Sequence, residues 1–142
     1  MTPRLLLVED DADNLELLTT ILSQTYRVFS YADASEALAA LETAKPEILL
    51  LDIGIGPFDG LECLAAMRAR PGYGSVPAIA LTGYGREAER KAFQAAGFQA
   101  VFIKPVLDYQ DFFGTITALL AATRGASERD EGTDHSARTT AA

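Results

Sequence analysis

The sequence predicts a single α/β domain built on a parallel β-sheet. Five short runs rich in Leu, Ile and Val alternate with stretches whose apolar residues follow helical spacing. The runs lack polar alternation, which is typical of strands buried on both faces of a parallel sheet. Five such repeats imply right-handed crossovers and a three-layer sandwich with helices on both faces of the sheet. With 142 residues, the chain is long enough for one packed domain and too short for two.

The expected strands are the five apolar runs, and helices are expected between and after them. The runs cover residues 5–8, 27–31, 48–51, 78–81 and 101–103. Helical spacing is clear in three of the intervening or following stretches. The residues that show it are Leu15, Leu18, Ile21 and Leu22, then Leu61, Leu64 and Met67, and finally Tyr109, Phe112, Phe113, Ile116, Leu119 and Leu120.

The other two helices are predicted from different signals. Asp33 stands three residues before Glu36, a spacing that favours a capped helix start. The helix expected over residues 86–96 has alanines and Phe93 as its apolar content, so its anchoring to the sheet is weak. We therefore expect this fourth helix to be the moving element of the domain, and expect partners to dock on the face that it forms with the last helix.

The composition limits the classes of partner and the compartment. The net charge is −8, and no cluster of Lys or Arg offsets the acids, so nucleic acid and membrane surfaces are not expected partners. The apolar run near the N-terminus is too short for a signal peptide or a membrane span, which predicts a cytoplasmic protein. The single cysteine, Cys63, excludes an internal disulfide.

The segment from residue 124 to residue 142 has no large apolar side chain. It cannot bury enough apolar surface to offset the entropy of ordering its chain, so we predict a folded domain over residues 1–123 and a disordered polar tail over residues 124–142. This leaves no residues for an output domain after the last helix. The expectation is therefore a stand-alone module, a relay intermediate or a domain excised from a larger protein, and the first two are favoured.

Residues with useful chemistry follow four of the five predicted strands. Glu9 and Asp10 end the first run, Asp52 the third, Thr82 the fourth and Lys104 the fifth. Sites in open parallel sheets form outside the carboxyl ends of the strands, so these side chains are expected to converge. Carboxylates from two strands suit Mg²⁺, which prefers oxygen ligands. An aspartate nucleophile accepts a phosphoryl group as an acyl phosphate, while a hydroxyl and an ammonium group stabilise the phosphoryl oxygens.

Four segments carry a resemblance to a known family. LLLVEDD, LLLDIGIGPFDG, IALTGYG and VFIKP, in this order and spacing, resemble the signature segments of the receiver domain of bacterial two-component response regulators, over residues 4–122. The similarity extends to stand-alone chemotaxis-type receivers and to receivers of hybrid sensor kinases. It implies a flavodoxin-like fold with strand order 2-1-3-4-5 and five helices. It also implies a phosphoprotein that is not an enzyme in the usual sense.

The resemblance assigns a role to each residue at the strand ends. Asp52 matches the phosphorylated aspartate, Thr82 the switch hydroxyl and Lys104 the lysine that pairs with the phosphoryl group. Glu9 and Asp10 match the acidic pair that binds Mg²⁺ or Mn²⁺ together with Asp52.

The resemblance also covers backbone groups and partners. The backbone carbonyl of Gly54 matches the group that completes the metal ligands, and the peptide bond between Lys104 and Pro105 matches one that is cis in the family. The implied phosphoryl donor is a sensor histidine kinase or a histidine phosphotransfer protein. The expected state is a monomer, or a weak homodimer through the fourth and fifth helices, that acts on a downstream protein.

Two positions depart from the family pattern. Val101 replaces the aromatic residue or histidine that receivers commonly place three residues before the lysine. The usual switch that couples threonine to an aromatic ring is therefore expected to be altered, and the alternative reporters of the state are Phe102, Tyr84 and Tyr109. The loop proline, normally four residues after the nucleophile, is Gly56 here and Pro57 follows it. A changed loop path with a retained site is the expectation.

Three other functions compete with the receiver. A phosphohydrolase of the haloacid-dehalogenase type needs an acid two residues after the nucleophile, where this chain has Gly54, so turnover on phosphate esters is not expected. A dinucleotide-binding module is disfavoured because the third glycine of its fingerprint would fall at Asp59. A receiver-like interaction module that takes no phosphate is the remaining alternative, favoured by Val101 and opposed by the complete set of strand-end residues.

Overall fold

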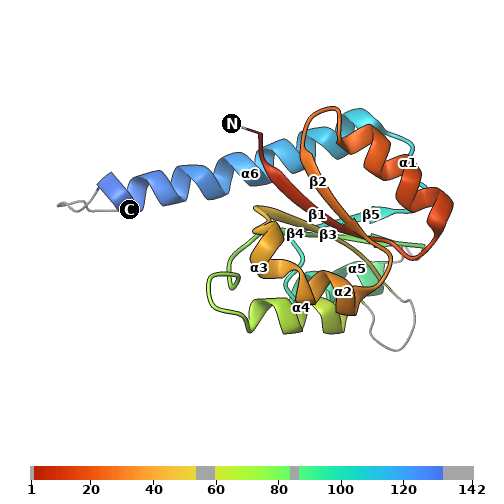
Figure 1. Ribbon diagram of the computed structural model, residues 1–142, viewed down its shortest axis with the longest axis horizontal. Coiled ribbons are helices and arrows are strands. Elements are labelled where there is room, and N and C mark those ends of the chain that lie inside the picture. Colours follow the sequence, from red (N-terminus) through yellow and green to blue (C-terminus); the bar gives the residue numbers. More distant parts are fainter. Residues whose placement is uncertain (1, 54–59, 84–86, 133–142) are drawn as a thin grey trace.

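The computed structural model describes residues 2–53, 60–83 and 87–132 (Figure 1). Five strands form one sheet in the order β2-β1-β3-β4-β5, and every neighbouring pair is parallel. The strands are β1 (Arg4–Val8), β2 (Arg27–Tyr31), β3 (Ile48–Asp52), β4 (Ala78–Thr82) and β5 (Ala100–Ile103). The predicted strands and their order are confirmed, each within one residue at either end.

Helices cover both faces of the sheet, as the three-layer prediction requires (Figure 1). On one face, α1 (Ala12–Leu22) and α6 (Tyr109–Gly132) pack on a cluster that includes Leu7 and Ile79. On the other face lie α2 (Ala34–Ala39), α3 (Leu41–Ala44), α4 (Gly60–Arg68) and α5 (Glu87–Ala95). Every residue of β3 and β4 is buried, which explains why these strands are almost wholly apolar. Their polar residues, Asp52 and Thr82, stand at the last position of each strand.

The second helical stretch departs from the prediction, because it forms two short helices. The part of the chain that the structure describes therefore contains six helices, where five were expected. The break falls at Ala40, whose N–H donates to the oxygens of both Glu36 and Ala37, and no side chain caps the start of α3. The backbone of Ala40, with φ −89° and ψ −1°, tightens the turn at this point.

The helix start predicted at Asp33 is confirmed, and α1 begins with a similar cap. The carboxylate of Asp33 accepts the N–H of Ser35 at 2.6 Å and caps α2. The carboxylate of Asp11 accepts the N–H of Asn14 at 3.0 Å and caps α1 in the same way. Asp13 lies in the first turn of α1, where its negative charge favours the positive end of the helix dipole.

The last helix, α6, buries the predicted apolar face. Phe112, Ile116 and Leu120 are buried against the sheet, and Phe112 meets Phe102 of β5 edge to face at 5.0 Å. The helix continues to Gly132 and extends beyond the body of the domain (Figure 1). It thus crosses the predicted boundary at residue 123, and the division into domain and tail stays a prediction. No helix among the described residues has the length and apolar character needed to cross a bilayer.

Candidate functional site

The polar residues predicted at the strand ends lie together at the carboxyl edge of the sheet. Glu9 follows β1, Asp52 ends the adjacent β3, and Thr82 ends β4, the next strand along. All three are buried, with exposed fractions of 0%, 4% and 0%. Burial of three polar side chains at one edge is costly unless each finds a partner, so this edge is built for a purpose other than packing.

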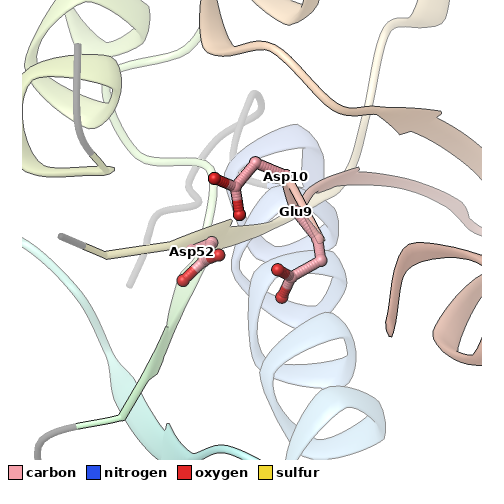
Figure 2. Close-up of side chains that lie close together, drawn as sticks. All are labelled: Glu9, Asp10 and Asp52. Atoms are coloured by element: carbon pink, nitrogen blue, oxygen red, sulfur yellow. The ribbon is translucent and has the colours of Figure 1, made fainter. Parts of the chain in front are cut away.

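Three carboxylates converge on one point of this edge. One oxygen atom from each of Glu9, Asp10 and Asp52 lies within 4.8 Å of the others, and Figure 2 shows the three side chains gathered at the ends of β1 and β3. Glu9 and Asp52 are buried while Asp10 is exposed, so the cluster is open on one side. Oxygen donors from two strands with one open side match what Mg²⁺ requires, because this ion retains several waters.

Lys104 supplies the positive charge of the site. Its Nζ donates to Oδ1 of Asp52 at 2.8 Å, and to Oε1 and Oε2 of Glu9 at 3.3 and 3.4 Å. The lysine side chain is 23% exposed, whereas those of Glu9 and Asp52 are 0% and 2% exposed. One ammonium group therefore serves two buried carboxylates, and the described charges leave an excess of negative charge at this edge.

The carboxyl group of Asp52 has a pKa near neutral pH. Burial, together with the neighbouring Glu9, raises the pKa of Asp52 to about 7, although the ammonium group of Lys104 acts in the opposite direction. For Lys104, burial lowers the pKa, but hydrogen bonding and charge pairing with Asp52 and Glu9 outweigh it and the net pKa is raised. Lys104 is thus charged over the whole neutral range, while the charge of Asp52 depends on what lies beside it.

One oxygen of Asp52 has no donor in the described part of the chain. Oδ2 is buried and accepts no hydrogen bond from it, in contrast with Oδ1. A cavity of about 40 Å³ is lined by Asp52, Asp10, Gly60 and Cys63, among others. This volume accommodates a water molecule or an ion. A buried acceptor without a donor next to such a cavity fits a bound cation.

Two donors from the start of α1 hold the carboxylate of Glu9. The N–H of Asp11 donates to Oε2 at 3.1 Å, and Nδ2 of Asn14 donates to Oε1 at 2.8 Å. Sequence reasoning missed Asn14, which lies four residues after Asp10, in the first turn of α1. The sequence signal that could have identified Asn14 is an amide side chain in the first turn of a helix that follows an acidic strand end.

Gly60 allows α4 to begin directly against the end of β3. A Cβ atom at this position would lie 2.4 Å from the backbone oxygen of Asp52 and 2.7 Å from Cδ1 of Ile53. Both distances are shorter than side chains tolerate, so only glycine fits between the helix start and the strand. This contact sets the backbone position of Asp52 from the side of α4.

The structure describes some of the other positions named in the sequence analysis and leaves others out. The Lys104–Pro105 peptide bond is cis, the geometry that the resemblance implied. Val101 is buried and packs in the cluster that contains Phe93 and Phe98, which places the missing aromatic position between α5 and the sheet. Gly54, Gly56, Pro57, Asp59 and Tyr84 lie outside the described residues.

Comparisons with known proteins agree with this geometry. A family model described as the response regulator receiver domain matches residues 5–116. A 14.6 kDa protein encoded in the sodA1 3′ region of Leptolyngbya boryana is 38% identical over 103 residues, which cover 72% of this chain and 79% of that protein. The transcriptional regulatory protein PrrA of Mycobacterium tuberculosis is 31% identical over 105 residues, 73% of this chain and 44% of PrrA, so the chain spans less than half of that relative.

A solved structure supports the same relationship. The response regulator receiver domain protein of Methanospirillum hungatei JF-1, described as CheY-like, superposes with a TM-score of 0.76 at 29% identity. The superposition covers 89% of this chain and 99% of that one. Similarity in backbone thus extends over nearly the whole of that receiver domain protein.

Proposed function

The chain belongs to the family of response regulator receiver domains, and on that premise we propose that Asp52 is its phosphoacceptor. The observation that carries the proposal is the position of Asp52, which is buried at the end of β3 with Lys104 at 2.8 Å and two further carboxylates within 4.8 Å. No other aspartate among the described residues has this combination of a paired ammonium group and an acidic cluster. The receiver family is a signalling module of two-component systems, so the modification is a signal and not a step in metabolism.

The proposed reaction transfers one phosphoryl group to a carboxylate. An oxygen of ionised Asp52 forms a bond to phosphorus as the bond from phosphorus to the donor nitrogen or oxygen breaks, and the donor leaves with that electron pair. A divalent cation held by Glu9, Asp10 and Asp52, Mg²⁺ or Mn²⁺, supplies charge neutralisation for the phosphoryl oxygens when bound. Lys104 is placed to contribute a second positive charge, and the hydroxyl of Thr82 to donate to a phosphoryl oxygen.

The proposed phosphoryl donor is a sensor histidine kinase or a histidine phosphotransfer protein, as the resemblance implies. The proposed output is a change in a protein-binding surface. Phosphorylation shifts the population of two states by no more than the difference in contacts that the phosphoryl group makes in each. Thr82 and Lys104 lie at the ends of β4 and β5, so new contacts to them pull on the strands that flank α5.

The test is intact-mass analysis after incubation with acetyl phosphate and Mg²⁺. We expect one phosphoryl adduct on the wild-type chain, none on Asp52→Asn, and none when EDTA replaces Mg²⁺. The matched control is Asp13→Asn, an exposed acid in the first turn of α1, which should form the adduct as the wild type does.

Three results would contradict the receiver assignment. An adduct that persists in Asp52→Asn, or no adduct with any phosphohistidine or acyl phosphate donor, would favour the phosphorylation-independent interaction module. Repeated turnover of a general phosphatase substrate would favour the hydrolase. Both alternatives are therefore separated from the receiver mechanism by measurements on the same preparation.

A further inference from the structure

The buried carboxylate of Glu9 is held by two kinds of donor. Two are neutral: the N–H of Asp11 at 3.1 Å and the side-chain amide of Asn14 at 2.8 Å. The third is the charged Nζ of Lys104 at 3.3 and 3.4 Å. The neutral donors come from the start of α1, and the charged donor comes from the segment that follows β5. They therefore respond differently to a charge placed in the site.

A cation among the three carboxylates repels an ammonium group and leaves a neutral amide in place. Lys104 lies closer to Asp52, at 2.8 Å, than to Glu9, so a cation beside both carboxylates weakens the contact between Lys104 and Glu9 first. A buried carboxylate that loses a donor becomes costly unless other donors stay. After Lys104 shifts, the donors that remain on Glu9 in the described structure are those of Asp11 and Asn14.

We propose that Asn14 is a positioning residue that orients Glu9 for the cation and frees Lys104 to serve Asp52. The proposal rests on the cation site of the proposed function and extends it to a residue outside the acidic cluster. Asn14 is half-buried and lines a groove of about 460 Å³ together with Glu9 and Lys104. Its side chain thus lies in the same groove as the carboxylate that it holds and the lysine that shares this carboxylate.

The amide of Asn14 is not needed to start the helix. The cap of α1 is formed by the carboxylate of Asp11, which accepts the backbone N–H of residue 14, and any residue except proline supplies that group. Removal of the side chain therefore leaves the helix cap intact and removes one hydrogen bond to Glu9. The two contributions are separable by substitution at a single position.

The experiment compares Asn14→Ala and Asn14→Leu with the full wild-type chain. Calorimetric titration with Mg²⁺ alone should show about ten-fold weaker binding in both variants, the loss expected for one hydrogen bond to a charged group. Phosphorylation by acetyl phosphate should need correspondingly more Mg²⁺ for half of its maximal rate. At saturating Mg²⁺ the rate should stay within about two-fold of wild type, because Asn14 does not touch the phosphoacceptor.

Asn14→Leu keeps the size of the side chain and a high helix propensity, so a folding defect in Asn14→Ala does not decide the result. The matched control is Glu16→Gln, an exposed residue of α1, which should bind Mg²⁺ like the wild type. Unchanged Mg²⁺ binding in both Asn14 variants, or equal weakening in Glu16→Gln, would overturn the proposal. Failure of the wild type to bind Mg²⁺ would instead overturn the cation site itself.

Discussion

At the residue scale, the decisive feature is that one lysine balances two buried carboxylates. Lys104 donates to both Asp52 and Glu9, and the side chains of the two acids are 2% and 0% exposed. Coulomb repulsion between the acids is strong at such burial, and the ammonium group is the main described charge that opposes it. The site is therefore held together by attraction to a cation, which is a lysine when no metal is bound.

Removal of this lysine should destabilise the metal-free protein. Substitution Lys104→Met leaves Glu9 and Asp52 buried without a cation, and loss of one partner of a buried pair costs about 3 kcal/mol or more in the free energy of unfolding. Urea denaturation at pH 8 in EDTA measures it. The control Lys91→Met, at an exposed position of α5, should change stability by less than about 0.5 kcal/mol. Equal stability of the two variants would contradict the role given to Lys104.

The raised pKa of Asp52 predicts a stability that depends on pH. The folded state holds a proton on Asp52 up to about pH 7, whereas the ordinary value is 3.8, so between these limits the folded chain binds more protons than the unfolded chain. Its contribution to stability is thus present at low pH and is lost as the pH rises toward 7. The measurement is the free energy of unfolding of the wild type minus that of Asp52→Asn, both in EDTA. This difference should fall as the pH rises through this range and level off above it. A flat difference would contradict the pKa.

At the scale of elements, two glycines in helices have opposite roles. Gly60 begins α4 against the backbone of Asp52, where a Cβ atom would lie 2.4 Å from the carbonyl oxygen. Gly114 is exposed in α6, and a Cβ atom there would meet nothing within 4 Å. The first glycine is required by a close approach, and the second costs helix stability with no structural return.

Alanine substitutions should separate these roles. Gly114→Ala should raise the free energy of unfolding by about 1 kcal/mol, the difference in helix propensity. Gly60→Ala should lower it by roughly 1–3 kcal/mol and slow phosphorylation of Asp52, because α4 must shift from the end of β3. Thermal denaturation and the rate of adduct formation measure the two effects. Stabilisation by Gly60→Ala would show that the helix start is not set by this contact.

Weak anchoring of α5 predicts faster hydrogen exchange. Phe93 is the buried residue of α5, whereas Phe112, Ile116 and Leu120 are buried from α6 on the opposite face. Amides of α5 should therefore exchange faster than those in the first half of α6, and phosphorylation should change protection in α5 more than in α6. Mass-spectrometric exchange with and without acetyl phosphate tests both statements. A change confined to α6 would remove α5 as the moving element.

The sequence predicted those features that depend on one residue and its near neighbours. Strand positions follow from apolar runs, and the helix cap at Asp33 follows from a side chain that acts within one turn. The strand ends placed Glu9, Asp52, Thr82 and Lys104 at one edge because parallel strands share their direction. Pattern reasoning succeeded where a single local rule was sufficient.

Features that depend on distances between elements were not predicted. The contact of Asn14 with Glu9 depends on how α1 leaves β1, and the contact of Gly60 with Asp52 depends on how α4 meets β3. The break between α2 and α3 results from a tightened turn at Ala40, where the sequence offers a continuous run of helix formers. For Asn14 and Gly60, tertiary packing decides among local conformations that the sequence allows.

At the scale of the whole molecule, the net charge of −8 sets the response to cations. Acids outnumber bases by 20 to 12, and part of that excess is concentrated at the carboxyl edge of the sheet around Glu9, Asp10 and Asp52. Such a distribution destabilises the folded chain through repulsion and attracts divalent cations to the edge. Screening by any salt and binding of a divalent cation at the cluster both relieve this repulsion. Only the second depends on which cation is present.

Binding at the cluster should raise the melting temperature beyond the effect of ionic strength. If 10 mM Mg²⁺ is about ten times the dissociation constant, selective binding to the folded state contributes about 1.4 kcal/mol. For a domain of this size that corresponds to an increase of roughly 3–6 °C. NaCl at matched ionic strength should give a smaller increase, because screening acts on all surface charges alike and leaves the buried pair largely unaffected.

Two variants distinguish the cluster from the rest of the acidic surface. Asp10→Asn removes one ligand from the cluster and should abolish most of the Mg²⁺ increase, while Asp111→Asn, an exposed acid in the first turn of α6, should retain it. Both substitutions change the net charge by the same amount, so a difference between them arises from position alone. An equal response of the two variants would mean that Mg²⁺ acts on the overall charge, and the carboxylates at the ends of β1 and β3 would then have no selective affinity for the ion.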